Sequence, residues 1–343
     1  MGRTHVEAAH RLDELDVRAV TGGRRAERLA GDYGLACEPS VEALVARDDI
    51  DALIVATPHH VHVEEALSAA RAGKHVLVEK PLATSAEDAC RMIEEARRAG
   101  IVLSVGYHQR FRESTRTARD LIRQGAIGTV RCVQMSALFD IEALRSENQF
   151  GGDWAWWKDP RSIAHLLNSG PHNIDLCRWW LEQEVFSVAA HSGSFREENP
   201  NENTTMALLG FDGGAMGTFW SSSVLPAPGF PDESFRFRIM GDEGLLDVNP
   251  YGAVQLARHG SWETVYRQPQ VQFDDPQAAF GSDNRMRAYC DQLAAFASSV
   301  RGQAGGEGTA EDGLAAVAVV RAMLESAASG RMVQLDPADR GSA

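Results

Sequence analysis

Cysteine is scarce in this sequence, and long apolar segments are missing from it. The five cysteines among 343 residues are scattered and include no C-x-x-C pair. This usage argues against a disulfide framework and predicts buried thiols in a reducing compartment, the cytoplasm. No apolar run approaches the roughly 18 residues that span a bilayer, and the first residues have no apolar signal core. We therefore expect no association with a membrane.

Basic residues are also in short supply. Lys and Arg number 34 against 48 Asp and Glu, which gives a net charge of −14, and the basic residues are dispersed. This balance argues against a nucleic-acid partner. His59, His60 and His62 lie close together, but no cysteine or obvious carboxylate accompanies them, so we expect no metal site.

What the sequence does contain is enough apolar material for a sizeable core. With 44% hydrophobic residues, the length favours two domains over one. Residues 51–81 predict a β-α-β unit, because two short apolar runs flank a helical repeat that closes on Gly73. Ligands bind beyond the carboxyl ends of strands in an open parallel sheet. Thr57-Pro58 and Glu79-Lys80-Pro81 should therefore lie side by side at the ligand-binding edge.

Three segments carry a resemblance to a known family. They are the run ATPHHVHVEEALSAARAGKHVLVEKPLA, the segment VGYHQRF at 105–111 and the segment GPHNID at 170–175. Together they are similar to the Gfo/Idh/MocA oxidoreductases, and the resemblance extends over nearly the whole chain. It implies an α/β fold with a Rossmann-like, doubly wound parallel sheet in residues 1–109. Residues 110–343 would form an α+β domain with an open, mostly antiparallel sheet, and its last helix would pack back on the first domain.

The pattern of the second half supports this division. Helices are predicted at 113–124, 284–300 and 311–329, and strands at 129–137, 185–192, 204–211, 215–223, 235–240 and 245–248.

The beginning of the sequence departs from the family. Residues 1–5 resemble the stretch just after the first strand, so that Gly2 corresponds to the last glycine of the dinucleotide fingerprint and Arg3 follows it. The strand and the earlier glycines are absent, which would leave a slot in the middle of the sheet. Two accounts remain open: the sequence starts at an internal Met, or the protein is shortened and binds its cofactor weakly or not at all.

The cofactor implied by the resemblance is NAD or NADP. NAD enzymes place an acidic residue near the end of the second strand to bind the ribose, whereas an arginine there accommodates a 2′-phosphate. This chain has Arg24 and Arg25 and no carboxylate at that place, which favours NADP, although paired arginines also commonly solvate a helix start. By resemblance, the remaining cofactor contacts are Thr57, Pro58, His59, His62, Glu79 and Lys80.

Lys80 and His172 are the predicted reacting pair. Hydride transfer from an alcohol needs a group that takes the hydroxyl proton, and imidazole suits that role at neutral pH. Lys80 would hydrogen-bond the same oxygen. Asn168 stands where the family commonly has Asp, four residues before His172, and is expected to contact or orient the substrate. Asp175 is expected to cap or brace His172.

Substrate-side candidates are Gln109, Arg110, Trp157 and Arg161. By resemblance, the second sheet would mediate a homodimer or homotetramer. The whole pattern predicts an NAD(P)-dependent enzyme that oxidises a secondary hydroxyl of a sugar, cyclitol or related polyol. Two alternatives stay open: a non-catalytic ligand sensor or scaffold, and a lyase or hydrolase that uses a tightly bound nicotinamide for transient oxidation.

Overall fold

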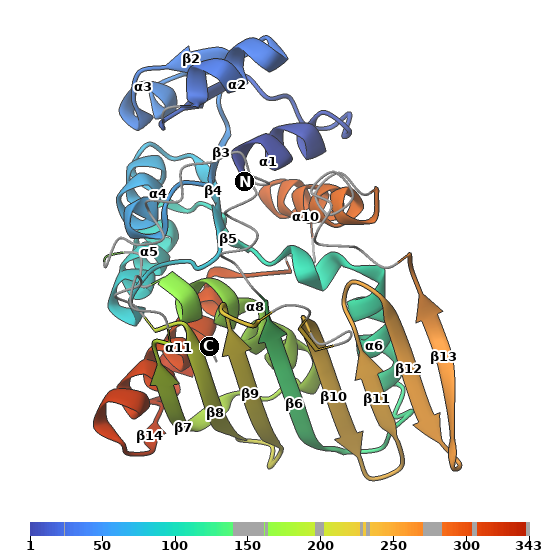
Figure 1. The fold of residues 1–343 in the computed structure, drawn as a ribbon. Coiled ribbons are helices and arrows are strands. Elements are labelled where there is room, and N and C mark those ends of the chain that lie inside the picture. Colours follow the sequence, from blue (N-terminus) through green and yellow to red (C-terminus); the bar gives the residue numbers. More distant parts are fainter. Residues whose placement is uncertain are drawn as a thin grey trace.

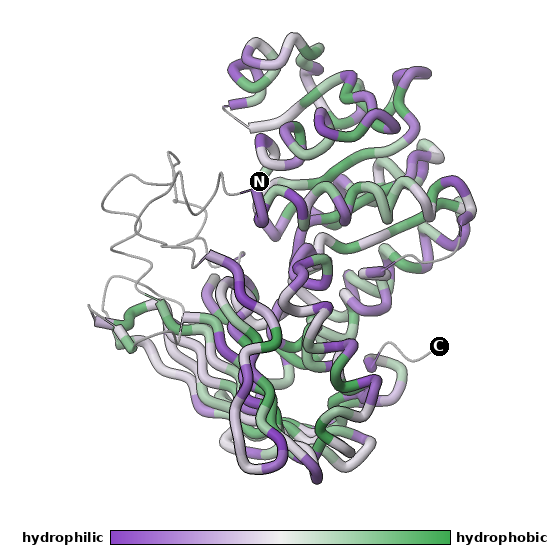
Figure 2. The backbone as a smooth tube through the Cα atoms, turned by 90° about the vertical axis from the view of Figure 1, so that its right-hand side faces the viewer, coloured by the Kyte–Doolittle hydropathy of each residue, from purple (hydrophilic) through white to green (hydrophobic). Residues whose placement is uncertain are grey.

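The computed structural model describes residues 1–23, 25–139, 161, 164–195, 202–226, 229–230, 234–269, 283–303 and 307–340. Strands and helices alternate in the first part of the chain, and a large sheet dominates the second part (Figure 1). Figure 2 shows the same two parts with the large sheet seen from its side.

The first part contains short parallel strands in two separate sheets. β1 pairs with β2 in one sheet, and β4 lies between β3 and β5 in the other. Among the described residues no strand bridges the two sheets. The strands are β1 (Ala19–Thr21), β2 (Ala36–Glu38), β3 (Ala52–Val55), β4 (His75–Glu79) and β5 (Leu103–Gly106). The helices are α1 (Gly2–Ala9), α2 (Ala26–Tyr33), α3 (Val41–Val45), α4 (His62–Arg71) and α5 (Ala86–Ala99).

Local sequence explains where these helices begin and end. The Ser85 hydroxyl accepts a hydrogen bond from the amide of Asp88 (3.1 Å), which satisfies a free donor in the first turn of α5. Gly73 follows α4 in the left-handed region (φ +71°), where a residue without Cβ is favoured. The β-α-β unit predicted for residues 51–81 is thus confirmed. A short 3-10 turn, η1 (His59–Val61), precedes α4, so the α-helix itself starts at His62.

The second part is built on a nine-stranded sheet in the order β13-β12-β11-β10-β6-β9-β8-β7-β14. All neighbours are antiparallel except β6 and β9, so the prediction of a mostly antiparallel sheet is confirmed. The sequence analysis missed β12, β13 and β14. The strands are β6 (Val130–Leu138), β7 (Val185–Gly193), β8 (Thr204–Phe211), β9 (Met216–Ser222), β10 (Phe235–Gly241), β11 (Leu245–Val248), β12 (Ala253–Arg258), β13 (Ser261–Arg267) and β14 (Val333–Gln334).

Helices cover one face of this sheet (Figure 1). They include α6 (Glu113–Arg123), α8 (Ala164–Leu181) and α11 (Ala310–Ser329). α11 also contacts α5 and β5, and α10 (Asp283–Val300) packs against α1 and against the 3-10 turn η2 (His108–Phe111). Late segments of the chain therefore complete the first part. Within the described ranges, no helix has both the length and the apolar character of a membrane span.

Helix α8 is fixed in the core at two points. Trp180 is fully buried, donates from Nε1 to the carbonyl of Thr115 (2.9 Å) and packs edge-on against Phe237. At Gly170 the helix approaches α11 so closely that an added Cβ would lie 2.9 Å from Cγ2 of Val320. These contacts determine where the side chains on the other flank of α8 lie.

Candidate active site

Lys80 and α8 meet where the two parts of the molecule join. Lys80 directly follows β4, and its Nζ donates to the backbone carbonyl of Asn168 (2.9 Å) and to Oδ1 of the same residue (2.7 Å). His172 lies one turn farther along α8, on the same flank. The structure therefore brings together the three residues that the sequence analysis grouped for catalysis.

Burial sets the protonation of this group. It lowers the pKa of Lys80 to about 8, although the neighbouring carboxylate of Glu79 opposes the shift. Burial, and after it the positive charge of Lys80, lowers the pKa of His172 to about 3. At neutral pH the lysine is thus mostly protonated and the imidazole is neutral.

Aromatic rings and imidazoles pack around His172. Its ring lies edge-on to that of His108, with centroids 4.9 Å apart, and His108 in turn stacks on Tyr289 of α10 at 4.5 Å. Burial and the neighbouring His172 lower the pKa of His108 well below its usual value. The sequence analysis did not single out His108 or Tyr289. His108 stood inside the quoted segment 105–111, whereas no local pattern marked Tyr289.

Glu79 is held on the other side of Lys80. Its Oε1 lies 2.8 Å from Nε2 of His5, and both side chains are buried. Burial alone would raise the pKa of Glu79, but the hydrogen bond and charge of His5, together with Lys80, lower it to about 2. The amino terminus and Gly2 lie near this carboxylate, at the start of α1. Burial lowers the pKa of the terminal amine, and the negative charge of Glu79 acts against that shift.

The expected cofactor contacts fall into two groups. Thr57, Pro58 and His59 follow β3 beside Lys80, and His59 is buried. His62 instead joins the two strand ends, because its ring nitrogens lie 2.9 Å from the carbonyls of Thr57 and Pro81. Neither ring nitrogen is left for a cofactor, which corrects our expectation for this residue.

Of the residues expected near the adenosine end, the structure describes Arg3 and Arg25. The guanidinium of Arg3 bonds to Asp32 and to the hydroxyl of Tyr33 (3.3 Å), both on α2. Arg25 is exposed at the residue before α2. Arg24 lies outside the described residues.

Arg110 does not face the substrate side as expected. It is buried and forms a two-pronged ion pair with Asp175 (2.9 and 2.6 Å), and one nitrogen also lies 2.9 Å from Asp312. Burial raises the pKa of Asp175 to about 6, against the opposing charge of Arg110. Asp175 thus holds Arg110 and η2, whereas we had expected it to brace His172.

Two of the other substrate-side candidates, Gln109 and Arg161, lie in the described part of the chain. Nε2 of Gln109 donates to the hydroxyl of Tyr251 (2.5 Å), and Arg161 is exposed. Trp157 lies outside the described residues. As far as the structure describes the chain, no cluster of metal-ligating side chains is present.

The residues at the junction fit a nicotinamide cofactor. Nδ1 of His108 and Nδ1 of His172 are buried without a hydrogen-bond partner in the described part of the chain. Buried polar atoms of this kind are normally satisfied, so they mark a place where a polar ligand completes the structure. They lie beside Lys80, at the carboxyl edge of the parallel sheet, where dinucleotides bind in this type of fold.

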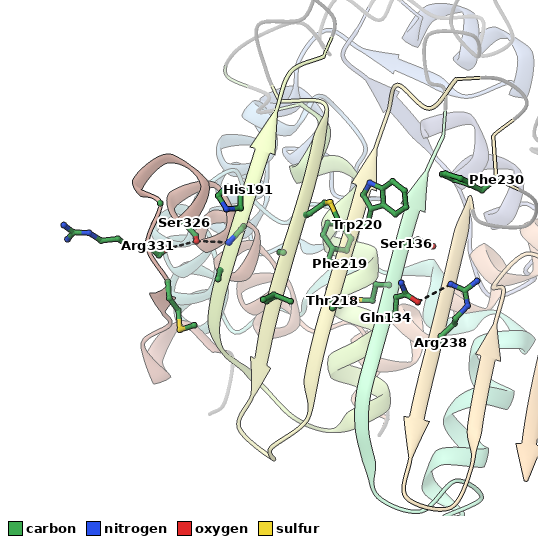
Figure 3. Close-up of a pocket in the computed structure, with 18 residues that line it drawn as sticks. Gln134, Ser136, His191, Thr218, Phe219, Trp220, Phe230, Arg238, Ser326 and Arg331 are labelled. Carbon is green, nitrogen blue, oxygen red and sulfur yellow. Dashed lines mark hydrogen bonds between the residues drawn. The ribbon is translucent and has the colours of Figure 1, made fainter.

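A hollow lies on the open face of the nine-stranded sheet (Figure 3). Its volume is about 820 Å³, and its lining includes Met206, Leu208, Trp220, Phe230 and Met332. Lys80, Asn168 and His172 are not among its lining residues. This hollow is therefore separate from the candidate active site.

A lysine at the edge of a Rossmann-like sheet, held by an asparagine on a helix that carries a histidine one turn farther along, is typical of two-domain oxidoreductases that use a nicotinamide cofactor. Residues 1–107 match the description "Oxidoreductase family, NAD-binding Rossmann fold", and residues 119–335 match "Oxidoreductase family, C-terminal alpha/beta domain". The chain belongs to the Gfo/Idh/MocA oxidoreductase family. The family, the fold class and the oxidoreductase activity indicated by the sequence are confirmed, as is the use of a nicotinamide cofactor.

Relatives and solved structures agree with this assignment. The chain is 30% identical over 305 residues to 1,5-anhydro-D-fructose reductase from Ensifer adhaerens, covering 87% of this chain and 83% of the relative. It is 30% identical over 329 residues to inositol 2-dehydrogenase 2 from Saccharopolyspora erythraea, covering 91% and 88%. The structure of an inositol dehydrogenase homolog complexed with NAD+ from Azotobacter vinelandii has the same fold, with a TM-score of 0.82 at 24% identity over 97% of this chain and 94% of that one.

Proposed function

We propose that the protein transfers a hydride between NAD(P) and a secondary hydroxyl or ketone of a sugar, cyclitol or related polyol. The observation that carries the proposal is the contact of Lys80 with Asn168, which places a protonated amine beside the neutral imidazole of His172. The names of the two relatives, a sugar reductase and an inositol dehydrogenase, support the substrate class.

In this proposal the nicotinamide, when bound, accepts the hydride from the substrate carbon. The ammonium of Lys80 has three donors, of which Asn168 takes two, so one is left for the substrate oxygen. His172 takes the hydroxyl proton. The positive charge of Lys80 is one cause of the low pKa of His172. Negative charge that develops on the substrate oxygen offsets that positive charge. The imidazole therefore becomes a stronger base as the reaction proceeds.

The test is the initial rate of NAD(P)+ reduction over a panel of sugars and cyclitols. Lys80→Met and His172→Gln should each lower kcat/KM by on the order of 100- to 10,000-fold, and His172→Gln should leave cofactor binding in place. Turnover without net cofactor reduction would favour the lyase or hydrolase alternative. Cofactor binding without any turnover in the wild-type protein would favour the sensor alternative.

We propose NADP as the preferred cofactor, bound by Gly2, Thr57, Pro58, His59 and Lys80, with Arg24 and Arg25 at its 2′-phosphate. Support comes from the end of β1, where Gly22 and Gly23 adopt left-handed conformations and exposed Arg25 follows. Fluorescence titration with NADPH and NADH tests this, because Arg25→Ala should weaken NADPH binding and leave NADH binding unchanged. Equal losses for both cofactors would contradict it.

We also propose that the open face of the large sheet joins two copies of the chain. Its hollow is largely apolar, and Met206 and Leu208 are 57% and 62% exposed. Exposed apolar patches of this kind mark interaction sites. Leu208→Lys should shift the molecular mass in sedimentation experiments toward the monomer, and an unchanged mass would contradict the proposal.

We further propose a domain boundary between residues 109 and 110, and a cytoplasmic location. The division of the strands between separate sheets supports the boundary.

Support for the location comes from the cysteines, since all five are unpaired.

A further inference from the structure

Arg112, at the junction between η2 and α6, is a buried arginine without a hydrogen-bond partner among the described residues. Its side chain is 2% exposed, and Nε, Nη1 and Nη2 all lack a hydrogen-bond partner in the part of the chain that the structure describes. Tyr251 covers one face of the guanidinium, with its ring centroid 4.0 Å from Cζ. A ring face stabilises the charge but does not satisfy donors that point outward in the guanidinium plane. Burial lowers the pKa of Arg112 and Tyr251 opposes that shift in part, but among the described residues no nitrogen of Arg112 has an acceptor in hydrogen-bond geometry.

The contrast with Arg110, two residues earlier, shows that burial alone does not cause this. Arg110 is 4% exposed, but it has the carboxylates of Asp175 and Asp312 as partners. A buried charge without such compensation costs several kcal/mol. The described residues supply carboxylates to Arg110 and none to Arg112, which leaves Arg112 ready for an acceptor that comes from outside.

Arg112 lies within electrostatic reach of the proposed reaction site. Its charge is among the causes that lower the pKa of both His108 and His172. Contacts connect the two places: Tyr251 over Arg112 receives the hydrogen bond of Gln109, the residue next to His108. Arg285, only 6% exposed, lies over Tyr289, on which His108 stacks. Positive charge therefore surrounds the site, while Glu79, the carboxylate beside Lys80, is already bonded to His5.

A planar fork of donors is the partner that proteins use for carboxylates and phosphates. We infer that Arg112, supported by the charge of Arg285, binds an oxyanion of the substrate, so that the enzyme acts on acidic sugars or polyols in preference to neutral ones. This inference rests on the proposed function, since it names the substrate class of the same site. Arg112 would be a specificity-determining residue that leaves the proton and hydride steps to Lys80 and His172.

Kinetics with matched substrates test the inference. The panel pairs D-glucose with D-glucuronate and D-glucose 6-phosphate, and D-galactose with D-galacturonate and D-galactose 6-phosphate. We expect kcat/KM to be higher for the acidic members, and the comparison of carboxylate with phosphate to show which oxyanion fits. Arg112→Met should lower kcat/KM for the acidic members by roughly 10- to 100-fold, through KM, and change it far less for the neutral members. Arg98→Met, which removes an exposed arginine paired with Glu95 on α5, is the matched control and should change neither.

A neutral preference in the wild-type protein, or equal losses for neutral and acidic members in Arg112→Met, would overturn the inference and leave the proposed function standing. Absence of turnover for the whole panel would count against the proposed function. Direct binding then decides the inference by itself: inorganic phosphate at millimolar concentration should raise the thermal midpoint of the wild-type protein and not that of Arg112→Met. Equal shifts, or none in the wild-type protein, would overturn it.

Stability without ligand gives an independent readout. If Arg112 served only the fold, Arg112→Met would lower the thermal midpoint. Because its buried charge has the ring of Tyr251 but no carboxylate partner among the described residues, we expect the substitution to raise the midpoint, and a lowered midpoint would contradict the inference. Arg112→Lys, which keeps the charge but not the fork, should recover only part of the preference for acidic substrates.

Discussion

The side chain of Lys80 has to be protonated and yet lies in a place that disfavours charge. Burial lowers its pKa to about 8, while the carboxylate of Glu79 acts in the opposite direction. The hydrogen bonds to Asn168 take two of its protons, and the proposed reaction needs the third. The reaction rate should therefore depend on pH in the range where Lys80 loses its proton.

We expect kcat/KM for alcohol oxidation to fall as the pH rises through about 8, because Lys80 then loses the proton that it shares with the substrate oxygen. In Glu79→Gln the fall should begin at lower pH, since the charge that raises the pKa of Lys80 is gone. Glu87→Gln, on the exposed surface of α5, is the control and should leave the profile unchanged. A profile that stays flat to pH 10 would contradict the assignment of Lys80.

Asn168 offers a second test on the same lysine. Asn168→Asp places a carboxylate at the position of Oδ1, 2.7 Å from Nζ, and should move the alkaline fall in rate to higher pH. Asn168→Leu removes the side-chain acceptor and should lower kcat by roughly 10- to 100-fold because Lys80 is no longer held. Equal profiles for Asn168→Asp and the wild-type protein would show that Lys80 and Asn168 separate when substrate binds.

At the scale of elements, the close approach of α8 to α11 controls where His172 lies. An added Cβ at Gly170 would stand 2.9 Å from Cγ2 of Val320, which is closer than packed atoms allow. Gly170→Ala should therefore destabilise the protein by about 1–3 kcal/mol in denaturant unfolding. The double variant Gly170→Ala, Val320→Ala should recover much of the lost free energy of unfolding. If instead the losses of the two single variants simply add, the helices do not meet at this point.

The elements that the sequence predicted well are those with strong local patterns. The β-α-β unit of residues 51–81 combines apolar runs with a helix that a glycine ends, and α8 carries a recognisable segment at residues 170–175. The outer strands β12 and β13 were missed, because β13 is almost wholly exposed and lacks the apolar alternation that marks a half-buried strand.

At the scale of the whole molecule, a buried ionic cluster joins the 3-10 turn η2, where the two parts meet, to two helices of the second part. Arg110 belongs to η2, Asp175 to α8 and Asp312 to α11, and Asp312 also lies 3.3 Å from Arg178. Removing one member of a buried pair leaves the other without compensation. The cluster therefore couples the junction near His108 to the helices of the second part.

We expect Asp175→Asn to destabilise the protein by about 3–5 kcal/mol, because it leaves Arg110 with a single carboxylate. Asp242→Asn is the control: Asp242 forms a similar two-pronged pair with Arg131, but at an exposed position, and the cost should be below about 1 kcal/mol. Thermal unfolding measures both. Similar costs for the two variants would show that the buried cluster contributes no more than a surface pair.

This cluster also explains why part of the site escaped the sequence analysis. Arg110 was expected on the substrate side, yet its two carboxylate partners lie 65 and 202 residues farther along the chain. The ring stack of His108 on Tyr289 joins η2 to α10, and the unsatisfied state of Arg112 depends on everything packed around it. Contacts of such long range leave no local pattern, whereas Lys80 and His172 stood inside recognisable segments.

The packing of α10 on α1 has a consequence for the order of events during synthesis on the ribosome. His5 lies edge-on to Tyr289, and Ala8 accepts a hydrogen bond from the thiol of Cys290 (3.6 Å). At roughly 5–20 residues per second, these partners emerge about 15–60 s after the amino terminus. For that interval the apolar flank of α1 has no partner from α10, which gives a holding chaperone time to act on this helix.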